Sequence, residues 1–98
     1  MKECTCNDVL TKLNNKETMH LIDVREDDEV AQGMIPTAIH IPLGQVPERM
    51  NELDKETTYI MVCRSGGRSG RATQFLEQAG YDVINMAGGM LEWDGPTE

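Results

Sequence analysis

Short apolar runs alternate with helix-like segments along the whole of this chain. The runs occupy residues 2–4, 20–24, 38–41, 59–62 and 82–86, and segments with helical spacing or helix-ending residues lie between them. Two neighbouring parallel strands need a long crossover connection, and a helix is the usual one. The alternation therefore predicts an α/β fold built on a parallel sheet.

Local signals mark the ends of two of the expected helices. Thr5 and Asp8 have the spacing of a capping pair, just ahead of a segment with one apolar face. A second helix is expected from Ser69 to Ala79, because Gly80 is a typical helix-ending residue. The core-facing positions expected on this second helix are Ala72, Phe75, Leu76 and Ala79.

Three shorter helices and a loose end complete the expected order. The acidic run 26–29 predicts the first turn of a solvent-facing helix that stops at Gly33, and residues 46–53 have helical spacing. A last short helix is expected at 90–93, and residues 94–98 are expected to form a frayed tail.

Length and charge limit the kinds of protein that this chain can be. It has 98 residues, a formal net charge of −8 and a pI near 4.6. We expect residues 1–98 to form a single domain. Nucleic acids and anionic membranes attract basic surfaces, so neither is an expected partner. No apolar stretch resembles a membrane span or a signal peptide, so a cytoplasmic location is expected.

The positive charges of the second half of the chain are concentrated in one segment. After Lys55 the only basic residues are Arg64, Arg68 and Arg71, and every later charged residue is acidic. A local positive site in an acidic background suits the capture of a small anion. The alternative interpretation is a solvated arginine cluster at the start of a helix.

Cys63 lies between a buried strand and an expected helix, in the loop Cys63-Arg64-Ser65-Gly66-Gly67-Arg68-Ser69. Backbone N–H groups and the helix dipole at such a turn favour a thiolate over a thiol. The two glycines allow the backbone to curl into a nest that holds an anion, and Arg64, Arg68 and Ser65 can add further donors. The loop therefore predicts a nucleophilic thiolate that needs no histidine.

The other cysteines and both histidines are expected to take no part in catalysis. Cys4 and Cys6 have too few neighbouring ligands for a zinc site, and we interpret them as packing or surface thiols. His20 and His40 lie in strand-like runs. No metal and no cofactor are expected, and a relay of sulfur through the two N-terminal cysteines stays an open question.

Three blocks of the sequence, taken in order, resemble the single-domain rhodanese family of sulfurtransferases. The first block is Leu21–Arg25 with Gly33–Ala38, the second is the loop Cys63–Ser69, and the third is Ala87–Trp93. The resemblance implies a rhodanese-like α/β fold, with an open, mainly parallel five-stranded sheet flanked by helices in three layers.

The resemblance also implies a reaction. Cys63 would take the outer sulfur of a donor such as thiosulfate, become a persulfide, and pass the sulfur to a small thiophile such as cyanide, a thiol or a protein. Residues 64–68 would cradle the persulfide, and Arg64 and Arg68 would attract the anionic donor.

Asp23 and Arg25 are candidates for the rim, expected to pair with each other or with the loop rather than to bind substrate. We expect a monomer.

Two alternatives to a small-molecule sulfurtransferase stay open. A sulfur-carrier or interaction module would use the same Cys63 persulfide but would require a partner protein. A phosphatase or arsenate reductase is disfavoured, because relatives of those kinds have the pattern Cys-x5-Arg, whereas Cys63 and Arg68 form Cys-x4-Arg.

The chain departs from the family's usual pattern at several positions. A histidine is usual at Met34 and a glycine at Thr37, and aromatic residues are common at Val30, Met86 and Met90. Methionine adapts to irregular spaces, so we expect the methionines to pack the core in place of rings. The alternative hypothesis is a softer rim around Cys63.

Overall fold

Five parallel strands form the sheet of the computed structural model, which describes all 98 residues. The strands are β1 (Lys2–Cys4), β2 (Leu21–Asp23), β3 (Ile39–His40), β4 (Thr58–Val62) and β5 (Asp82–Met86). Their order across the sheet is β1-β5-β4-β2-β3, and every neighbouring pair is parallel. The predicted parallel sheet is confirmed, and β4, the strand that leads to Cys63, lies at its centre.

Four α-helices and two 3₁₀ turns lie between the strands, and a third 3₁₀ turn follows the last strand. The helices are α1 (Cys6–Asn14), α2 (Asp27–Val30), α3 (Val46–Arg49) and α4 (Gly67–Gln78), and the turns are η1 (Leu43–Gln45), η2 (Met50–Glu52) and η3 (Gly89–Glu92). The predicted capping pair opens α1. The hydroxyl of Thr5 accepts from the N–H of Asp8 at 3.0 Å, and the Asp8 carboxylate accepts from the N–H of Thr5 at 2.9 Å.

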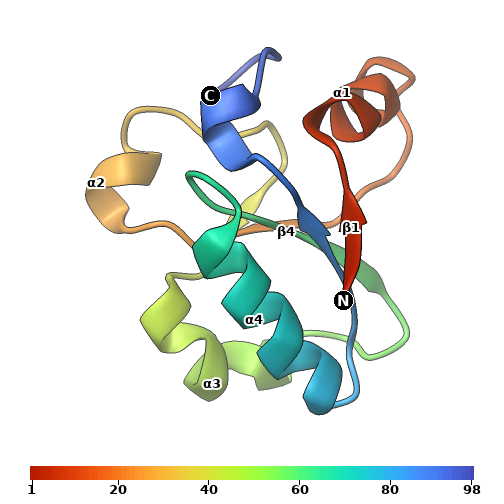
Figure 1. Cartoon of the computed structure of the whole chain (residues 1–98), viewed down its shortest axis with the longest axis vertical. Coiled ribbons are helices and arrows are strands. Elements are labelled where there is room, and N and C mark those ends of the chain that lie inside the picture. The colour runs from red at the N-terminus through yellow and green to blue at the C-terminus, as the bar shows by residue number, and fades with distance from the viewer.

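The two faces of the sheet bury two separate cores. Along β4, Tyr59 and Met61 pack with Ala72 and Leu76 of α4, while the alternate residues of the strand pack on the other face with Val9 of α1. Figure 1 shows α4 well apart from α1, with the strands running between them. This is the predicted three-layer arrangement, and Cys63 belongs to the core on the α4 face.

Several predicted bounds differ from the structure. The strands predicted at 20–24 and 38–41 are shorter at both ends, and the helix predicted at 46–53 divides into α3 and η2. Helix α4 begins at Gly67 rather than Ser69, because Gly66 has a φ of +102° and turns the chain into the helix as its N-cap. Gly67 and Arg68 therefore belong to the first turn of α4.

Phe75 was predicted to face the core, and this is wrong. Its neighbours Ala72 and Leu76 form the buried stripe of α4, whereas Phe75 lies at the edge of that stripe and is 41% exposed. There it lines an apolar surface groove together with Leu43 and Pro47.

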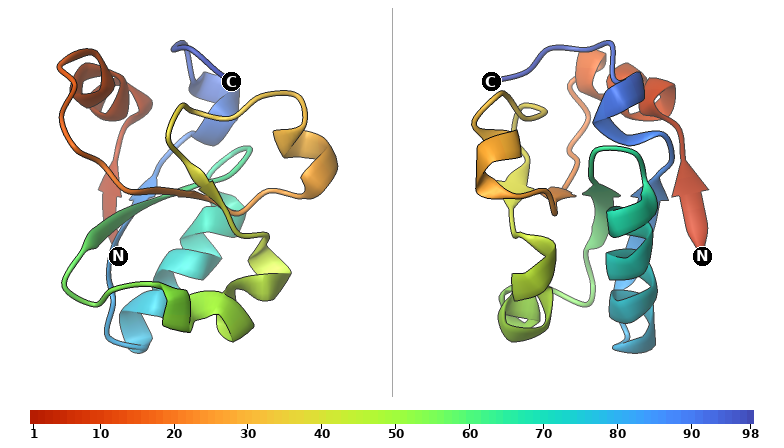
Figure 2. Two further views of the ribbon diagram at one scale, coloured as in Figure 1. Left: turned by 180° about the vertical axis from the view of Figure 1, so that it is seen from behind. Right: turned by 60° about the vertical axis from the view of Figure 1, so that its left-hand side comes forward.

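The prediction of a frayed tail is also wrong. Met34 and Glu98 exchange two backbone hydrogen bonds, of 3.0 and 2.8 Å, and the indole N–H of Trp93 donates to the carbonyl of Pro96 at 3.0 Å. Figure 2 shows the C-terminal segment lying beside the connection between α2 and β3. Backbone pairing with a segment far away in the sequence holds the last residues in place.

Membrane-spanning segments are not found among the helices, since none combines the length and the apolar character that a bilayer crossing requires.

Candidate active site

The candidate active site forms where several chain segments leave the carboxyl ends of the strands. Cys63 follows β4 directly, Arg25 lies two residues beyond β2, and the Gly88-Gly89 turn follows β5. Ligand sites of open parallel sheets lie at this edge. Figure 1 shows the loop before α4, the short helix α2 and the segment after β5 gathered at this end of the sheet.

The sulfur of Cys63 lies at the start of the loop and is surrounded by hydrogen-bond donors. The N–H of Gly66 donates to Sγ at 3.0 Å, and the hydroxyl of Ser69 lies 3.3 Å from it. Burial alone raises the pKa of this thiol. Hydrogen bonds from the Ser69 hydroxyl and from the backbone N–H groups of Ser69, Gly66 and Ser65 outweigh burial and lower the pKa below its ordinary value. The loop thus favours the thiolate.

The Gly88-Gly89 turn supports this loop through the carbonyl groups of the loop. The N–H of Met90 donates to the Cys63 carbonyl at 2.8 Å, and the N–H of Leu91 donates to the Arg64 carbonyl at 2.9 Å. Gly89 has a φ of +58°, and a Cβ there would stand 2.5 Å from both carbonyl oxygens. The close approach therefore requires glycine. These two hydrogen bonds fix the backbone at the start of the loop.

Asn85 is a site residue that the sequence analysis missed. It lies on β5, is 2% exposed, and accepts from the Ser69 hydroxyl at 2.5 Å while its amide donates to the Gly66 carbonyl at 3.2 Å. A serine hydroxyl has one hydrogen, so at any moment Ser69 donates to one of three neighbours: the Asn85 oxygen, the Cys63 sulfur or the Gly66 carbonyl at 3.3 Å. The available signal was a polar residue between apolar residues of the strand, Ile84 and Met86.

Arg68 is bound by an acidic partner from α2. Its two terminal nitrogens donate to the two carboxylate oxygens of Glu29 at 2.6 and 2.7 Å. This pairing lowers the pKa of Glu29 to about 2 and raises that of Arg68, to which the nearby Cys63 charge also contributes. The interpretation of the acidic run as a solvated helix end is therefore wrong for Glu29.

The rim candidates Asp23 and Arg25 pair with each other, as the sequence analysis expected. Both are buried, and the guanidinium contacts the carboxylate at 3.0 Å through Nε and at 2.8 Å through Nη2. Arg25 also donates to the Gly33 carbonyl at 2.8 Å and to the Glu29 carbonyl at 3.4 Å. The pair therefore holds α2 and the segment after it against the end of β2.

Beside the loop lies an open hollow of about 290 Å³ lined by Arg25, Glu29, Gln32, Arg64, Met90 and Leu91. Three arginines lie in or near this hollow. Arg25 is paired with Asp23 and Arg68 with Glu29, whereas Arg64 is exposed and forms no ion pair. Ser65 and Gly67 are exposed around the same loop. Met90 thus lies at the rim, whereas Met86 is fully buried in the core on the α1 face, where it packs as predicted.

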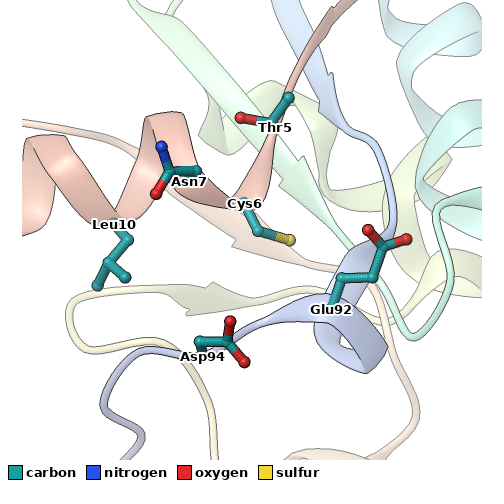
Figure 3. Close-up of a pocket in the computed structure, with 6 residues that line it drawn as sticks. All are labelled: Thr5, Cys6, Asn7, Leu10, Glu92 and Asp94. Carbon is teal, nitrogen blue, oxygen red and sulfur yellow. The ribbon is translucent and has the colours of Figure 1, made fainter.

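The N-terminal cysteines lie in a different setting. Figure 3 shows Cys6 in a pocket of about 210 Å³ between α1 and the C-terminal segment, facing the carboxylates of Glu92 and Asp94. Burial and these two carboxylates raise the pKa of Cys6, and its thiol donates to the Gly89 carbonyl at 3.2 Å. Burial, followed by Asp8, raises the pKa of Cys4 to about 11. Only Cys63 has a thiol that its surroundings make more acidic.

The histidines are directed elsewhere. His40 pairs through Nε2 with the carbonyl of Arg25 at 2.7 Å, and His20 contacts the edge of the Tyr59 ring just before β2 begins. No group of three or more His, Cys, Asp or Glu side chains is arranged to hold a metal ion.

Comparison with known proteins agrees with this geometry. A family model described as the rhodanese-like domain matches residues 5–95. The chain belongs to the rhodanese-like domain family. It is similar to the Bacillus subtilis protein YtwF, named as a candidate sulfurtransferase, with 45% identity over 98 residues that cover 100% of this chain and 95% of that protein. It is also similar to B. subtilis YrkF, named as a candidate sulfur carrier, with 40% identity, covering 89% of this chain and 48% of that protein.

A solved rhodanese-like domain protein from Staphylococcus aureus has the same architecture. Its TM-score to this chain is 0.94 at 37% identity, and the match covers 100% of this chain and 97% of the other. The rhodanese-like fold expected from the three sequence blocks is therefore confirmed. The span matched by the family model includes Cys63 and each of the residues that surround it.

Proposed function

We propose that this rhodanese-like protein is a sulfurtransferase that carries a sulfane sulfur as a persulfide on Cys63. Membership of the family and the likeness to a candidate sulfurtransferase support transfer of sulfur in general. The observation that carries the proposal is the environment of the Cys63 sulfur. Gly66 and Ser69 direct hydrogen-bond donors at it, and its pKa is lowered, so that the nucleophilic thiolate is favoured relative to an ordinary cysteine.

With thiosulfate as the donor, the step balances without a cofactor. The Cys63 thiolate attacks the outer sulfur, a new S–S bond forms, and the old S–S bond breaks with its electron pair leaving on sulfite. The persulfide anion that remains on Cys63 takes over the hydrogen-bond donors that held the thiolate. An acceptor thiolate or cyanide then attacks the outer sulfur and releases Cys63 as a thiolate.

The loop residues have separable roles in this proposal. Ser65, Gly66 and Ser69 stabilise the negative sulfur through their N–H groups and the Ser69 hydroxyl. Gly67 and Arg68 open α4, whose N-terminus adds a favourable dipole. Arg64 is exposed at the hollow and attracts the anionic donor.

The contacts of Arg68 argue against phosphate-ester hydrolysis. An arginine at that place in a phosphate-binding loop would direct its two N–H groups at phosphate oxygens, whereas those of Arg68 bind the Glu29 carboxylate. Together with the Cys-x4-Arg spacing, this leaves sulfur transfer as the function that the site supports best.

A sulfur carrier that needs a partner protein is the second candidate. The Cys63 side chain is 0% exposed, and the residues around the hollow include exposed Leu91 and acidic α2. These features favour a mechanism in which a partner docks at the rim before sulfur is passed. Rapid turnover with thiosulfate and cyanide alone distinguishes the enzyme from the carrier, which needs the partner for turnover.

Intact-mass measurement after incubation with thiosulfate tests the proposal. We expect the wild type to gain one sulfur atom and Cys63→Ser to gain none. Cys4→Ser and Cys6→Ser serve as matched thiol controls and should gain sulfur as the wild type does. Absence of a gain with every sulfur donor, together with hydrolysis of phosphate esters, would overturn it.

A further inference from the structure

We propose that Glu29 determines the charge of the sulfur donor, because it neutralises Arg68 and leaves Arg64 as the one unpaired cation at the pocket. The inference rests on the proposed sulfur transfer at Cys63. It assigns to an acidic residue of α2 a part in selecting the substrate, favouring donors with one negative charge over donors with two.

The geometry of the Glu29 pair supports this role. The contact is bidentate, at 2.6 and 2.7 Å, and the two side chains are only 24% and 31% exposed. A bidentate, partly buried pair is strong and weakly screened by salt. Thiosulfate therefore cannot recruit Arg68 without displacing a carboxylate that already satisfies it.

The second arginine beside the hollow is neutralised in the same way. Asp23 binds Arg25 through three nitrogen–oxygen contacts of 3.0 Å or less, and the pair is buried. Two cations near the hollow are thus matched by two carboxylates. Arg64 is exposed and has no ion pair, so it supplies the remaining positive charge.

This balance matters because the rest of the protein repels anions. The chain has a net charge of −8, and Glu26, Asp27 and Asp28 are exposed on the segment that carries Glu29. The electrostatic free energy of a donor in this field scales with its charge. When a carboxylate at the pocket is removed, the electrostatic free energy of a doubly charged donor therefore becomes more favourable by twice as much as that of a singly charged donor.

Two donors that differ in charge but share their chemistry test the inference. Thiosulfate is a dianion and releases sulfite, whereas methanethiosulfonate is a monoanion and releases methanesulfinate, and the Cys63 thiolate attacks the outer sulfur of each. For Glu29→Gln we expect kcat/KM to rise about tenfold with thiosulfate and about threefold with methanethiosulfonate. Arg64→Gln should lower kcat/KM with both donors, and the decrease should be larger with thiosulfate.

Asp28→Asn is the matched control. It removes the same charge from the same helix, but Asp28 is exposed, and the carboxylate that pairs with Arg68 is that of Glu29. We expect a change below about twofold with either donor, since exposed charges are screened. Equal effects of Glu29→Gln and Asp28→Asn would overturn the inference, because general surface charge would then explain both.

Glutamine has the size of glutamate and still offers Arg68 a carbonyl oxygen, so Arg68 should keep its position in Glu29→Gln. If the Glu29 pair were only a structural tie between α2 and α4, the variant would lose activity equally with both donors. That outcome, or an unchanged ratio of the two kcat/KM values, would overturn the inference.

A binding measurement separates this inference from the proposed function. Calorimetric titration of thiosulfate into Cys63→Ser and Cys63→Ser/Glu29→Gln needs no sulfur transfer, and we expect the second Kd to be about tenfold lower. If the wild type formed no persulfide, the proposed function would be wrong, but the difference in Kd between the two variants would still test the role of Glu29. Equal Kd values would remove the role of Glu29 alone.

Discussion

The Ser69 hydroxyl lies 2.5 Å from the side-chain oxygen of Asn85, within hydrogen-bond distance, and both side chains are buried. The same Ser69 hydroxyl lies 3.3 Å from the Cys63 sulfur, and the Asn85 amide donates to the Gly66 carbonyl. Strand β5 therefore fixes two of the groups that surround the sulfur. The reactive loop depends on a neighbouring strand and not only on its own sequence.

Ser69→Ala is expected to raise the pKa of Cys63. The Ser69 hydroxyl stabilises the thiolate, so its removal makes the thiol less acidic, while the backbone N–H groups that also lower the pKa are kept. The pH dependence of iodoacetamide alkylation measures this pKa in a Cys4→Ser/Cys6→Ser background. Its midpoint should move to higher pH. Ser65→Ala is the control, since Ser65 acts through its backbone N–H, and a midpoint that moves equally in both variants would contradict the assignment.

Asn85→Ala is expected to destabilise the fold. It removes two buried hydrogen bonds, to the Ser69 hydroxyl and to the Gly66 carbonyl, although that carbonyl keeps the N–H of Gly70. Each lost hydrogen bond costs about 0.5–1.5 kcal/mol. Urea unfolding should show a decrease in the free energy of unfolding of at least this size. Asn51→Ala changes an exposed asparagine in η2 and should stay within about 0.5 kcal/mol of the wild type. Similar losses in both variants would mean that the Asn85 contacts contribute little.

Gly89→Ala is expected to displace the reactive loop. The φ of +58° disfavours alanine, and its Cβ would stand 2.5 Å from the carbonyl oxygens of Cys63 and Arg64. We expect a loss of more than about 2 kcal/mol in stability and slower alkylation of Cys63. Gly44→Ala is the control, because a Cβ at Gly44 meets no atom within 4 Å. A fully stable and fully reactive Gly89→Ala would show that the turn can move without disturbing the loop.

The layered sheet was predictable because its signals are local. Strand periodicity, the Thr5–Asp8 capping pair and the Asp23–Arg25 pair all involve residues that are close together in the sequence. The Asn85–Ser69 and Glu29–Arg68 contacts join residues 16 and 39 positions apart. No periodic pattern identifies partners at such separations. The sequence analysis therefore expected Arg68 to attract the anionic donor, and it missed the carboxylate of Glu29 that neutralises Arg68.

Thr37→Gly is expected to stabilise the protein, because Thr37 has a φ of +73° at a position where family members usually have glycine. A β-branched residue is strained in this conformation by about 1–3 kcal/mol, and glycine relieves that strain at a smaller cost in unfolded-state entropy. We expect the free energy of unfolding in urea to rise by about 1 kcal/mol. The control Thr18→Gly lacks a positive φ and should lower stability by about 0.5–1 kcal/mol. A decrease for Thr37→Gly as large as that for Thr18→Gly would mean that the surrounding segment, which includes the buried Ile35, relieves the strain by other means.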